Sequence, residues 1–170
     1  VGVRPDGTLF APEAKDQLFV GDDCYVFSHH DDIARTMEIF GKQTTKQERV
    51  VLVGGGNVGL TVAQHLEAGP LRVRTKMIEK NRKCAERAAE GLERTIVLNG
   101  DGLDAALLAE AGISRADAML AVTDDDKTNM LSCVRAKAEG CPYVIALIND
   151  PTLVPLMSHL GIDAHINPRQ

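Results

Sequence analysis

Residues 50–59 read VVLVGGGNVG, a short apolar run that leads directly into glycines spaced G-x-G-x-x-G. The run has no polar break and is rich in β-branched side chains, which predicts a parallel strand buried on both faces. Gly54 would permit a tight turn, Gly56 would let a pyrophosphate approach the backbone, and Gly59 would let a helix pack closely on the strand. We therefore predict a strand, a phosphate-binding turn and a helix.

The predicted helix carries an apolar stripe at intervals of four, formed by Val58, Val62 and Leu66. Its free N–H groups and its positive dipole end would face the glycine turn, where they would stabilise an anion. A glycine turn that holds no ligand is the alternative interpretation. An acidic residue at the end of the next strand would favour a ligand over that alternative.

Such an acidic residue is present. Residues 71–78 are predicted to form the second strand, and Glu79 follows at about 20 residues beyond the last glycine, the spacing expected of a ribose-binding acid. A carboxylate there accepts hydrogen bonds from a ribose diol and repels a 2′-phosphate. This favours NAD, NADH or an adenine nucleotide over NADP, and the nearby cations Lys80 and Arg82 could soften that discrimination.

The composition describes a globular chain of 170 residues, with 44% hydrophobic and 25% charged residues. A net charge of −5 without a basic stripe argues against nucleic acid as a partner. No apolar run approaches the ~18 residues of a membrane span, and the start lacks the pattern of a signal peptide, so we expect a cytosolic chain. The four cysteines form no ligand motif and are expected to be buried, reduced thiols: Cys24, Cys84, Cys133 and Cys141.

Residues 1–41 follow a different pattern. Short strands are expected at residues 1–3, 8–10 and 24–27, separated by turns at 4–7 and 21–22. Asp31 or Asp32 can cap a helix that ends at Gly41. His29 and His30 suggest a metal site, but adjacent side chains point apart in an extended segment, so a helix-entry loop is the preferred interpretation.

The polar and basic residues 42–49 are expected to form a linker, and residues 50–170 to form the nucleotide-binding domain. There, strands and helices alternate, which predicts an α/β fold with a doubly wound parallel Rossmann sheet of six strands, preceded by the end of a small β-rich α+β subdomain. After residue 78 the expected helices are residues 81–89, 104–111, 128–139 and 152–160, and the expected strands are 95–98, 118–122, 143–148 and 164–166.

Two polar loops follow predicted strands, at the edge where ligands of such sheets bind. In Asn99-Gly100-Asp101-Gly102, Asp101 would hydrogen-bond an adenine amine or a ribose, and a plain Asp-Gly turn is the alternative. In residues 123–126, TDDD, the acids are expected mainly to cap a helix. The alternative is a ligand contact, in which Thr123 would touch the second half of a dinucleotide or a phosphate and the acids would hold a cation.

Several motifs together resemble the RCK, or KTN, family of potassium-conductance regulators. They are VVLVGGGNVG, MIEKN, LNGDG, AVTDDD, INDP and INPR, within residues 50–169. More narrowly, the chain resembles the cytosolic regulatory subunits of Trk potassium-uptake systems. Those subunits are tandems of two domain pairs, and residues 1–41 resemble the final part of the family's C-terminal subdomain, called RCK-C.

The resemblance implies a regulatory subunit and not an enzyme. It implies NAD or NADH as the ligand, with ATP or ADP as the alternative, and rings of Rossmann domains that gate a membrane potassium transporter subunit of the TrkH or TrkG kind. The protein would then be peripheral at the inner face of the cell membrane. The ligand residues implied by motif position are Gly54, Gly56, Asn57, Val58 and Gly59 at the phosphates, Glu79 at the ribose with Lys80 beside it, Gly100 and Asp101 near adenine, and Thr123 farther along the cleft.

The residues also argue against catalysis. A dehydrogenase needs a substrate domain with a general acid or base, and only residues 167–170 follow the last predicted strand. No Ser, Cys or Asp lies at a sequence position that would indicate a catalytic pair with any of three histidines, His65, His159 and His165. The alternative hypothesis is that the protein is part of an enzyme. In that case the sequence would be the cofactor domain of an NAD-dependent oxidoreductase whose catalytic domain lies outside it.

Overall fold

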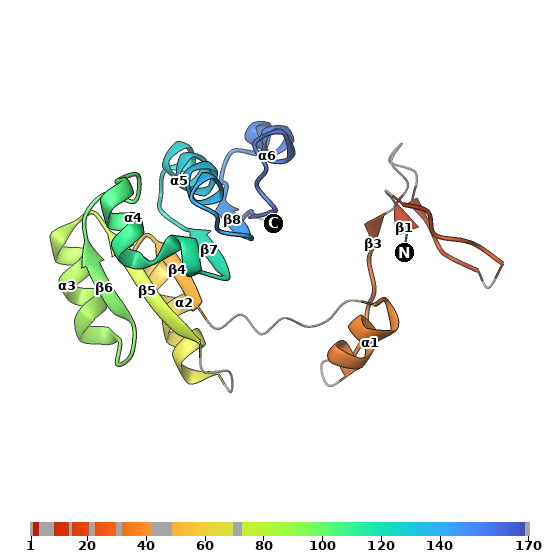
Figure 1. The fold of residues 1–170 in the computed structure, drawn as a ribbon, viewed down its shortest axis with the longest axis horizontal. Coiled ribbons are helices and arrows are strands. Elements are labelled where there is room, and N and C mark those ends of the chain that lie inside the picture. Colours follow the sequence, from red (N-terminus) through yellow and green to blue (C-terminus); the bar gives the residue numbers. More distant parts are fainter. Residues whose placement is uncertain are drawn as a thin grey trace. The chain divides into compact units, whose positions relative to one another are not determined.

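The computed structural model describes residues 2–3, 9–13, 15–20, 23–29, 32–41, 49–69 and 73–168. The chain divides into two compact units, Val1–Lys46 and Gln47–Gln170, and each is described by itself (Figure 1). The turns expected at 4–7 and 21–22, His30, Asp31, most of the expected linker (42–48), the start of the second predicted strand (71–72) and residues 169–170 lie outside the described part. None of the described helices is both long and apolar enough to cross a membrane.

The first unit contains a small antiparallel sheet and a helix. The strands are β1 (Gly2–Val3), β2 (Leu9–Phe10) and β3 (Asp23–Cys24), in the order β2-β1-β3, and the helix is α1 (Ile33–Ile39). The prediction of a strand over residues 24–27 was wrong beyond Cys24. Cys24 pairs with Gly2 at the beginning of β1, and β3 ends at Cys24.

The second unit is built on one parallel sheet of six strands in the order β6-β5-β4-β7-β8-β9, which confirms the predicted doubly wound Rossmann fold. The strands are β4 (Arg49–Val53), β5 (Arg74–Glu79), β6 (Ile96–Asn99), β7 (Ala118–Ala121), β8 (Val144–Leu147) and β9 (Ala164–Ile166). Strand order reverses between β4 and β7, because the chain crosses from β6 at one edge back to the centre. The carboxyl ends of β4 and β7 therefore border the crevice where ligands of such sheets bind.

Helices cover both faces of this sheet (Figure 1). They are α2 (Asn57–Ala68), α3 (Arg82–Gly91), α4 (Ala105–Ala111), α5 (Asp126–Ala138) and α6 (Val154–His159), with short 3-10 turns η2 (Ile113–Arg115) and η3 (Pro151–Leu153). One buried cluster joins the sheet to α2 and α3 through Ala63 and Ala88. The other joins it to α4, α5 and α6 through residues such as Leu108, Cys133 and Met157.

The inner face of α2 differs from the predicted stripe at its first turn. Val58 is 44% exposed, and the buried positions of the helix are Gly59 and Ala63. Val62 and Leu66 are partly buried against the core, as predicted. Small residues, and not Val58, face the sheet from α2. The start of the helix lies against the glycine turn, where a side chain at position 59 would not fit.

The thiols divide by depth. Cys133 and Cys141 are buried and Cys84 is half-buried, whereas Cys24 is exposed, so the expectation of a buried thiol was wrong for Cys24. Burial raises the pKa of Cys133 to about 12 and also raises the pKa of Cys141. These two thiols are therefore neutral at physiological pH and act as small apolar core residues.

Candidate functional site

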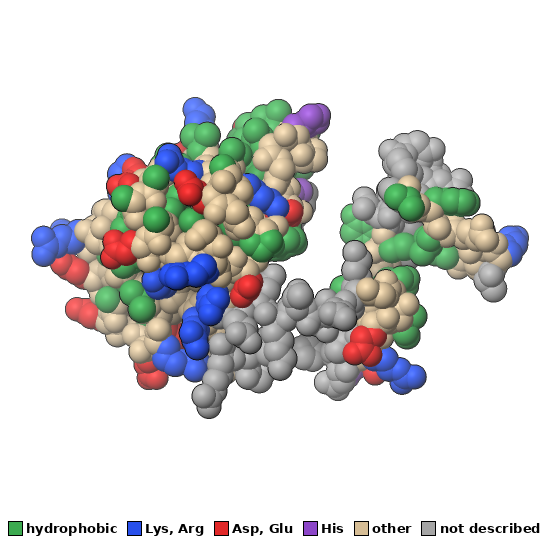
Figure 2. Space-filling model, in the orientation of Figure 1, with side chains coloured by type: hydrophobic (Ala, Val, Ile, Leu, Met, Phe, Trp, Pro, Cys, Tyr) green, Lys and Arg blue, Asp and Glu red, His purple; other side chains and the backbone are tan. Residues whose placement is uncertain are grey.

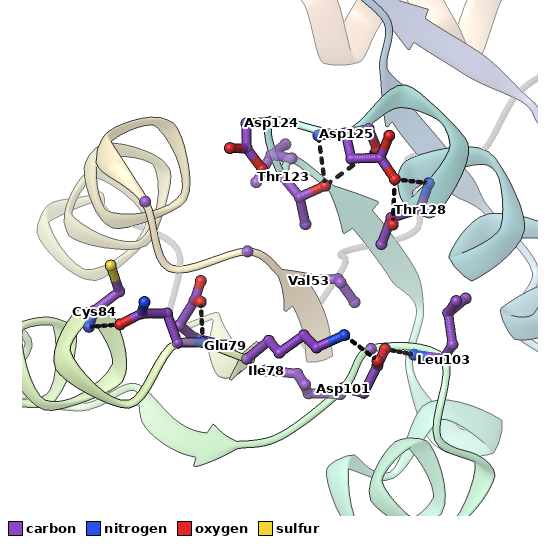
Figure 3. Close-up of a pocket in the computed structure, with 16 residues that line it drawn as sticks. Val53, Ile78, Glu79, Cys84, Asp101, Leu103, Thr123, Asp124, Asp125 and Thr128 are labelled. Atoms are coloured by element: carbon purple, nitrogen blue, oxygen red, sulfur yellow. Dashed lines mark hydrogen bonds and ion pairs between the residues drawn. The ribbon is translucent and has the colours of Figure 1, made fainter.

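A cavity of about 440 Å³ opens at the carboxyl ends of β4, β5 and β7 (Figure 3). Its lining combines an apolar base with polar groups from four loops, which is the usual make-up of a small-molecule site. The lining residues are Val53, Gly54, Gly56, Ile78, Glu79, Lys80, Asn81, Cys84, Asp101, Gly102, Leu103, Val122, Thr123, Asp124, Asp125 and Thr128.

Two of the motif glycines have a structural reason that is independent of any ligand. Gly54 has φ 110°, and a Cβ there would lie 2.9 Å from the backbone nitrogen of Thr123. A Cβ on Gly59 would lie 1.9 Å from the carbonyl oxygen of Gly54. Side chains at either position would push β4, α2 and the loop after β7 apart, so both glycines fix the shape of the turn.

Gly56 has no such reason. Its φ of −69° is open to any residue, and a Cβ there would meet nothing within 4 Å. Gly56 also precedes α2 as its N-cap without a side-chain cap, and the first turn of the helix holds no acidic residue. The N-terminal N–H groups of α2 therefore lack a side-chain acceptor beside a cavity-lining glycine.

Glu79, the last residue of β5, connects the second strand to the glycine turn. Its Oε2 accepts a hydrogen bond from the Gly55 backbone N–H, and its Oε1 accepts one from the Asn81 N–H at 2.6 Å. Asn81 in turn caps α3, since its side chain accepts from the backbone N–H of Cys84. The carboxylate is thus held at the mouth of the cavity by backbone groups on both sides, with lone pairs left for a ligand.

Lys80 and Asp101 lie on the rim of the cavity and form an ion pair at 2.8 Å (Figure 3). Asp101 Oδ1 also accepts from the Leu103 backbone N–H. Hydrogen bonds from Lys80 and Leu103 hold the pKa of Asp101 below its usual range, so the carboxylate is ionised at neutral pH. The pair joins the loop after β5 to the loop after β6.

Asn129 on α5 is fully buried and organises the loop after β7. Its Oδ1 accepts from both the backbone N–H and the hydroxyl of Thr123, at 2.9 and 2.7 Å. Its Nδ2 donates to the carbonyls of Thr123 and Leu147, at 3.0 and 2.8 Å. One amide therefore ties the ends of β7 and β8 together and positions Thr123 at the cavity.

The three acids after Thr123 have different roles. Asp125 caps α5, where it accepts from the Thr128 hydroxyl and backbone N–H, and these bonds lower its pKa. Asp126 accepts from the backbone N–H groups of Asn149 and Asp150, so it bridges to the loop after β8. The predicted capping role of this acidic run is thus observed. Asp124 lines the cavity without a hydrogen bond or ion pair to any described residue.

The predicted site residues separate into three groups. Gly54, Gly56, Glu79, Lys80, Asp101 and Thr123 line the cavity. Asn57 and Val58 line an adjoining, more open pocket together with Asn149 and Pro168. Gly59 and Gly100 line neither pocket. At Gly100 a Cβ would lie 2.6 Å from the side chain of Leu107, which gives this glycine a packing role.

Sequence reasoning missed Cys84 and Asn129, whereas Asp124 belongs to the acidic run that it had singled out. Asn129 had a signal, because it shares one helical face with Cys133 and Ala136, and a polar side chain on an apolar face needs buried partners. Cys84 had a weaker one, its place in the first turn of the helix after Glu79. Among the described residues, no group of three His, Cys, Asp or Glu side chains could hold a metal ion.

The comparison with known proteins gives the chain's relatives. A family model described as the TrkA-N domain matches residues 50–168. The chain belongs to the TrkA-N domain family. One curated relative, the Trk system potassium uptake protein TrkA of Azorhizobium caulinodans, is 42% identical over all 170 residues, and the match spans 37% of that relative. The present chain thus covers well under half the length of the relative.

Solved structures share the fold of the TrkA-N domain. The TrkA-N domain of inner membrane protein ybaL from Escherichia coli superposes with a TM-score of 0.63 at 18% identity, covering 72% of this chain and 88% of that one. A structure described as the GsuK channel bound to NAD superposes with a TM-score of 0.61 at 19% identity, covering 72% of this chain and 22% of that one. Both similarities concern the fold alone and agree with the Rossmann assignment.

Proposed function

We propose that this TrkA-N domain binds NAD or NADH in the cavity and that the full protein is a regulatory subunit that uses this binding to gate a membrane potassium-uptake transporter. ATP or ADP is the alternative ligand. The proposal draws on the named relative, a Trk system potassium uptake protein, and on the NAD-bound neighbour of the same fold. The main support for the proposal comes from the residues that line the cavity.

Gly56 is the observation that carries the proposal. Gly54 and Gly59 are required by the turn, but no contact in the described structure requires a glycine at position 56. A ligand that approaches the backbone there supplies the missing reason. The uncapped N-terminus of α2 makes that ligand an anion, because its N–H groups and dipole stabilise negative charge.

The remaining contacts follow from the cavity geometry. With a pyrophosphate against Gly54, Gly56, Asn57 and Val58, the ribose meets the carboxylate of Glu79 at the end of β5, while Gly59 lets α2 pack closely behind the turn. Adenine then extends toward the Lys80–Asp101 pair, and Thr123 and Asp124 face the other half of a dinucleotide. Glu79 disfavours a 2′-phosphate, and the amine of Lys80, already paired with Asp101, offers that phosphate limited compensation.

Regulation fits the cavity better than catalysis. Asp101 and Asp125 have lowered pKa values and are engaged in an ion pair and a helix cap, so both are poor general acids or bases at neutral pH. A regulator needs only a coupling of ~1–3 kcal/mol between the nucleotide site and the transporter. Contact between Rossmann domains in a homo-oligomer would carry this coupling, and the exposed Leu131, Tyr143, Leu156 and Leu160 offer apolar surface for it.

Calorimetric titration with NADH, NAD, ATP and ADP tests the binding proposal, with Gly56→Ala as the variant and Gly91→Ala as its control. The added methyl group at position 56 points into open space and should spare the fold, yet it should weaken the preferred nucleotide about tenfold or more, the scale of one or two hydrogen bonds to a charged group. Gly91 lies at the end of α3, away from the cavity, and its variant should bind normally.

Absence of binding by the wild-type chain to all four nucleotides would reject the ligand assignment. The regulatory part is tested separately, by potassium uptake in cells that carry the full-length protein with or without Gly56→Ala. Uptake that responds to the nucleotide only in the wild type supports gating. Uptake that is equal in both, despite lost binding, would show that this site does not control transport.

A further inference from the structure

A second pocket, of about 330 Å³, lies at the opposite end of the parallel sheet, where β4, β5 and β7 begin. Four cationic side chains line it: Arg49, Arg74, Lys76 and Arg115. We call this the basic pocket. Figure 2 shows Lys and Arg side chains gathered over the beginnings of β4 and β5. We propose that the basic pocket binds a phosphorylated anion, independently of the nucleotide cavity.

The strand register places these charges side by side. Arg49 pairs with Arg74 and Val51 pairs with Lys76 across the parallel strands β4 and β5. Paired residues of neighbouring strands project from the same face, and the strands are about 4.8 Å apart. Arg49, Arg74 and Lys76 therefore share one face at one end of the sheet, and Arg115 joins them from η2. Like charges in register repel each other and reduce stability unless an anion compensates them.

The described residues supply little compensation. The pocket lining contains no acidic side chain. Lys76 has a structural role, because its Nζ donates to the carbonyl of Glu110 in the last turn of α4 at 2.8 Å. Among the described residues, no ion pair joins a carboxylate to the guanidinium of Arg49, Arg74 or Arg115. Asp117 Oδ2 accepts a hydrogen bond from the backbone N–H of Arg49 at 2.9 Å.

Composition does not account for the cluster. The chain carries 24 acidic against 19 basic residues, so its composition as a whole has no excess of basic residues. Three arginines together on this background need a local reason. Arginine stays charged at all accessible pH values, and its planar fork matches the oxygens of a phosphoryl group in two parallel hydrogen bonds. The apolar base formed by Val51, Ala111 and Ala116 would exclude water from one side of such a ligand and strengthen the contacts.

The inference does not rest on nucleotide binding. The cavity lies where the strands end and the basic pocket where they begin, and the two linings share no residue. A phosphoryl group for this site has two sources of the same chemistry, a free phosphorylated small molecule or a phospholipid headgroup at a membrane surface. The experiments below separate these sources.

The first experiment locates binding on the wild-type chain. Inorganic tripolyphosphate is titrated while backbone amide shifts are followed by two-dimensional NMR. We expect saturable shifts at Arg74, Gly112 and Arg115. Shifts at residues 54–59 would report the glycine turn and bear only on the proposed nucleotide function. If the amides of the basic pocket do not move, while anionic vesicles also fail to bind, the inference is overturned.

The second experiment removes charge. Arg49→Gln with Arg74→Gln should weaken tripolyphosphate at the basic pocket about tenfold or more, since charge-assisted hydrogen bonds are lost. The matched control is Arg82→Gln with Arg87→Gln on α3, which removes the same charge elsewhere and should change affinity less than about threefold. Arg115→Gln gives a single-site check. If both double variants lost the same affinity for tripolyphosphate, the effect would come from the general charge of the surface, and the inference would be overturned.

Sedimentation with vesicles then identifies the source. Binding to phosphatidylglycerol vesicles but not to phosphatidylcholine vesicles, lost in the Arg49 and Arg74 double variant and kept in the control, assigns the site to lipid headgroups. Tripolyphosphate binding without vesicle binding assigns it to a free phosphorylated ligand. Either result supports a phosphoryl site.

Discussion

Glu79 accepts a hydrogen bond from the backbone N–H of Gly55, so the end of β5 is joined to the glycine turn that follows β4. The same carboxylate accepts from the Asn81 N–H before α3. In the proposed complex it also meets the ribose. The phosphate turn and the ribose contact are therefore parts of one hydrogen-bonded unit, and a change at Glu79 should affect both.

Glu79→Gln tests this relationship. A glutamine keeps the shape but is neutral and presents one acceptor oxygen, so it can satisfy only one of the Gly55 and Asn81 N–H groups. We expect nucleotide affinity to fall by ~1.5–3 kcal/mol and the free energy of unfolding to fall by about 1 kcal/mol. Calorimetry and urea denaturation measure the two effects.

Glu86→Gln is the matched control, because Glu86 is an exposed α3 carboxylate paired with Arg82 outside the cavity. It should leave the affinity unchanged and stability within ~0.5 kcal/mol. A normal affinity in Glu79→Gln would contradict the assignment of Glu79 to the ribose.

Asn129 offers a second test, of the loop after β7. Asn129→Ala leaves the Thr123 N–H and the Leu147 carbonyl without their buried partner, and it also removes packed volume. The free energy of unfolding should fall by ~2–4 kcal/mol. Gln64→Ala, which removes an exposed amide with one long hydrogen bond, should cost less than ~0.5 kcal/mol in the same urea experiment. Similar losses in both variants would show that Asn129 is not the organising residue.

The sequence was sufficient to predict the backbone plan of the second unit. The apolar run of β4, the glycine spacing and the alternation of strands with helices point to one sheet order, since each local preference agrees with the whole. Glu79 was located for the same reason, because the end of the second strand always reaches the edge where the glycine turn lies.

What the sequence did not predict depends on contacts between distant segments. Asn129 lies 18 residues before its partner Leu147, and nothing local indicates that pairing. Val58 was placed inward by a spacing of four, whereas the packing of α2 on the turn selects Gly59 and Ala63. In the first unit, β3 ends at Cys24 because its pairing with β1 ends there, a limit that propensity alone does not report.

Glu67 makes stability depend on pH. Burial raises its pKa, but this is outweighed by hydrogen bonds from the Thr95 hydroxyl and from the backbone N–H groups of Glu93, Arg94 and Thr95, which lower the pKa from 4.5 to about 2. The folded pKa lies below the unfolded one. Glu67 therefore stabilises the fold above pH 4.5, and this contribution is lost as the pH falls toward 2.

Glu67→Gln should lower the free energy of unfolding by about 1 kcal/mol at pH 7, a value reduced for the partial exposure of the side chain. The difference from wild type should shrink steadily in urea titrations between pH 4.5 and the acid limit of folding. Glu86→Gln serves again as the control and should show no such trend. If the difference in the free energy of unfolding between Glu67→Gln and wild type did not change with pH, the loss of stability would come from the changed side-chain shape and not from the lost charge.

Gly59 and Gly91 give opposite predictions for the same substitution. Both lie in helices, where alanine is intrinsically favoured over glycine by ~0.8–1 kcal/mol. At Gly91 a Cβ would make ordinary contact with Leu60 at 3.6 Å, so Gly91→Ala should raise the free energy of unfolding by ~0.5–1 kcal/mol. At Gly59 the Cβ would lie 1.9 Å from the Gly54 carbonyl oxygen, and a backbone atom cannot move aside as a flexible side chain can.

The clash at Gly59 must therefore exceed the gain in helix propensity. We expect Gly59→Ala to lower the free energy of unfolding by ~2 kcal/mol or more, on the scale of overpacking in a rigid core. Urea denaturation of the two variants under one condition measures both signs. If Gly59→Ala were neutral or stabilising, α2 would have room to move away from β4, and the glycine turn would not be the rigid support that the proposed phosphate site requires.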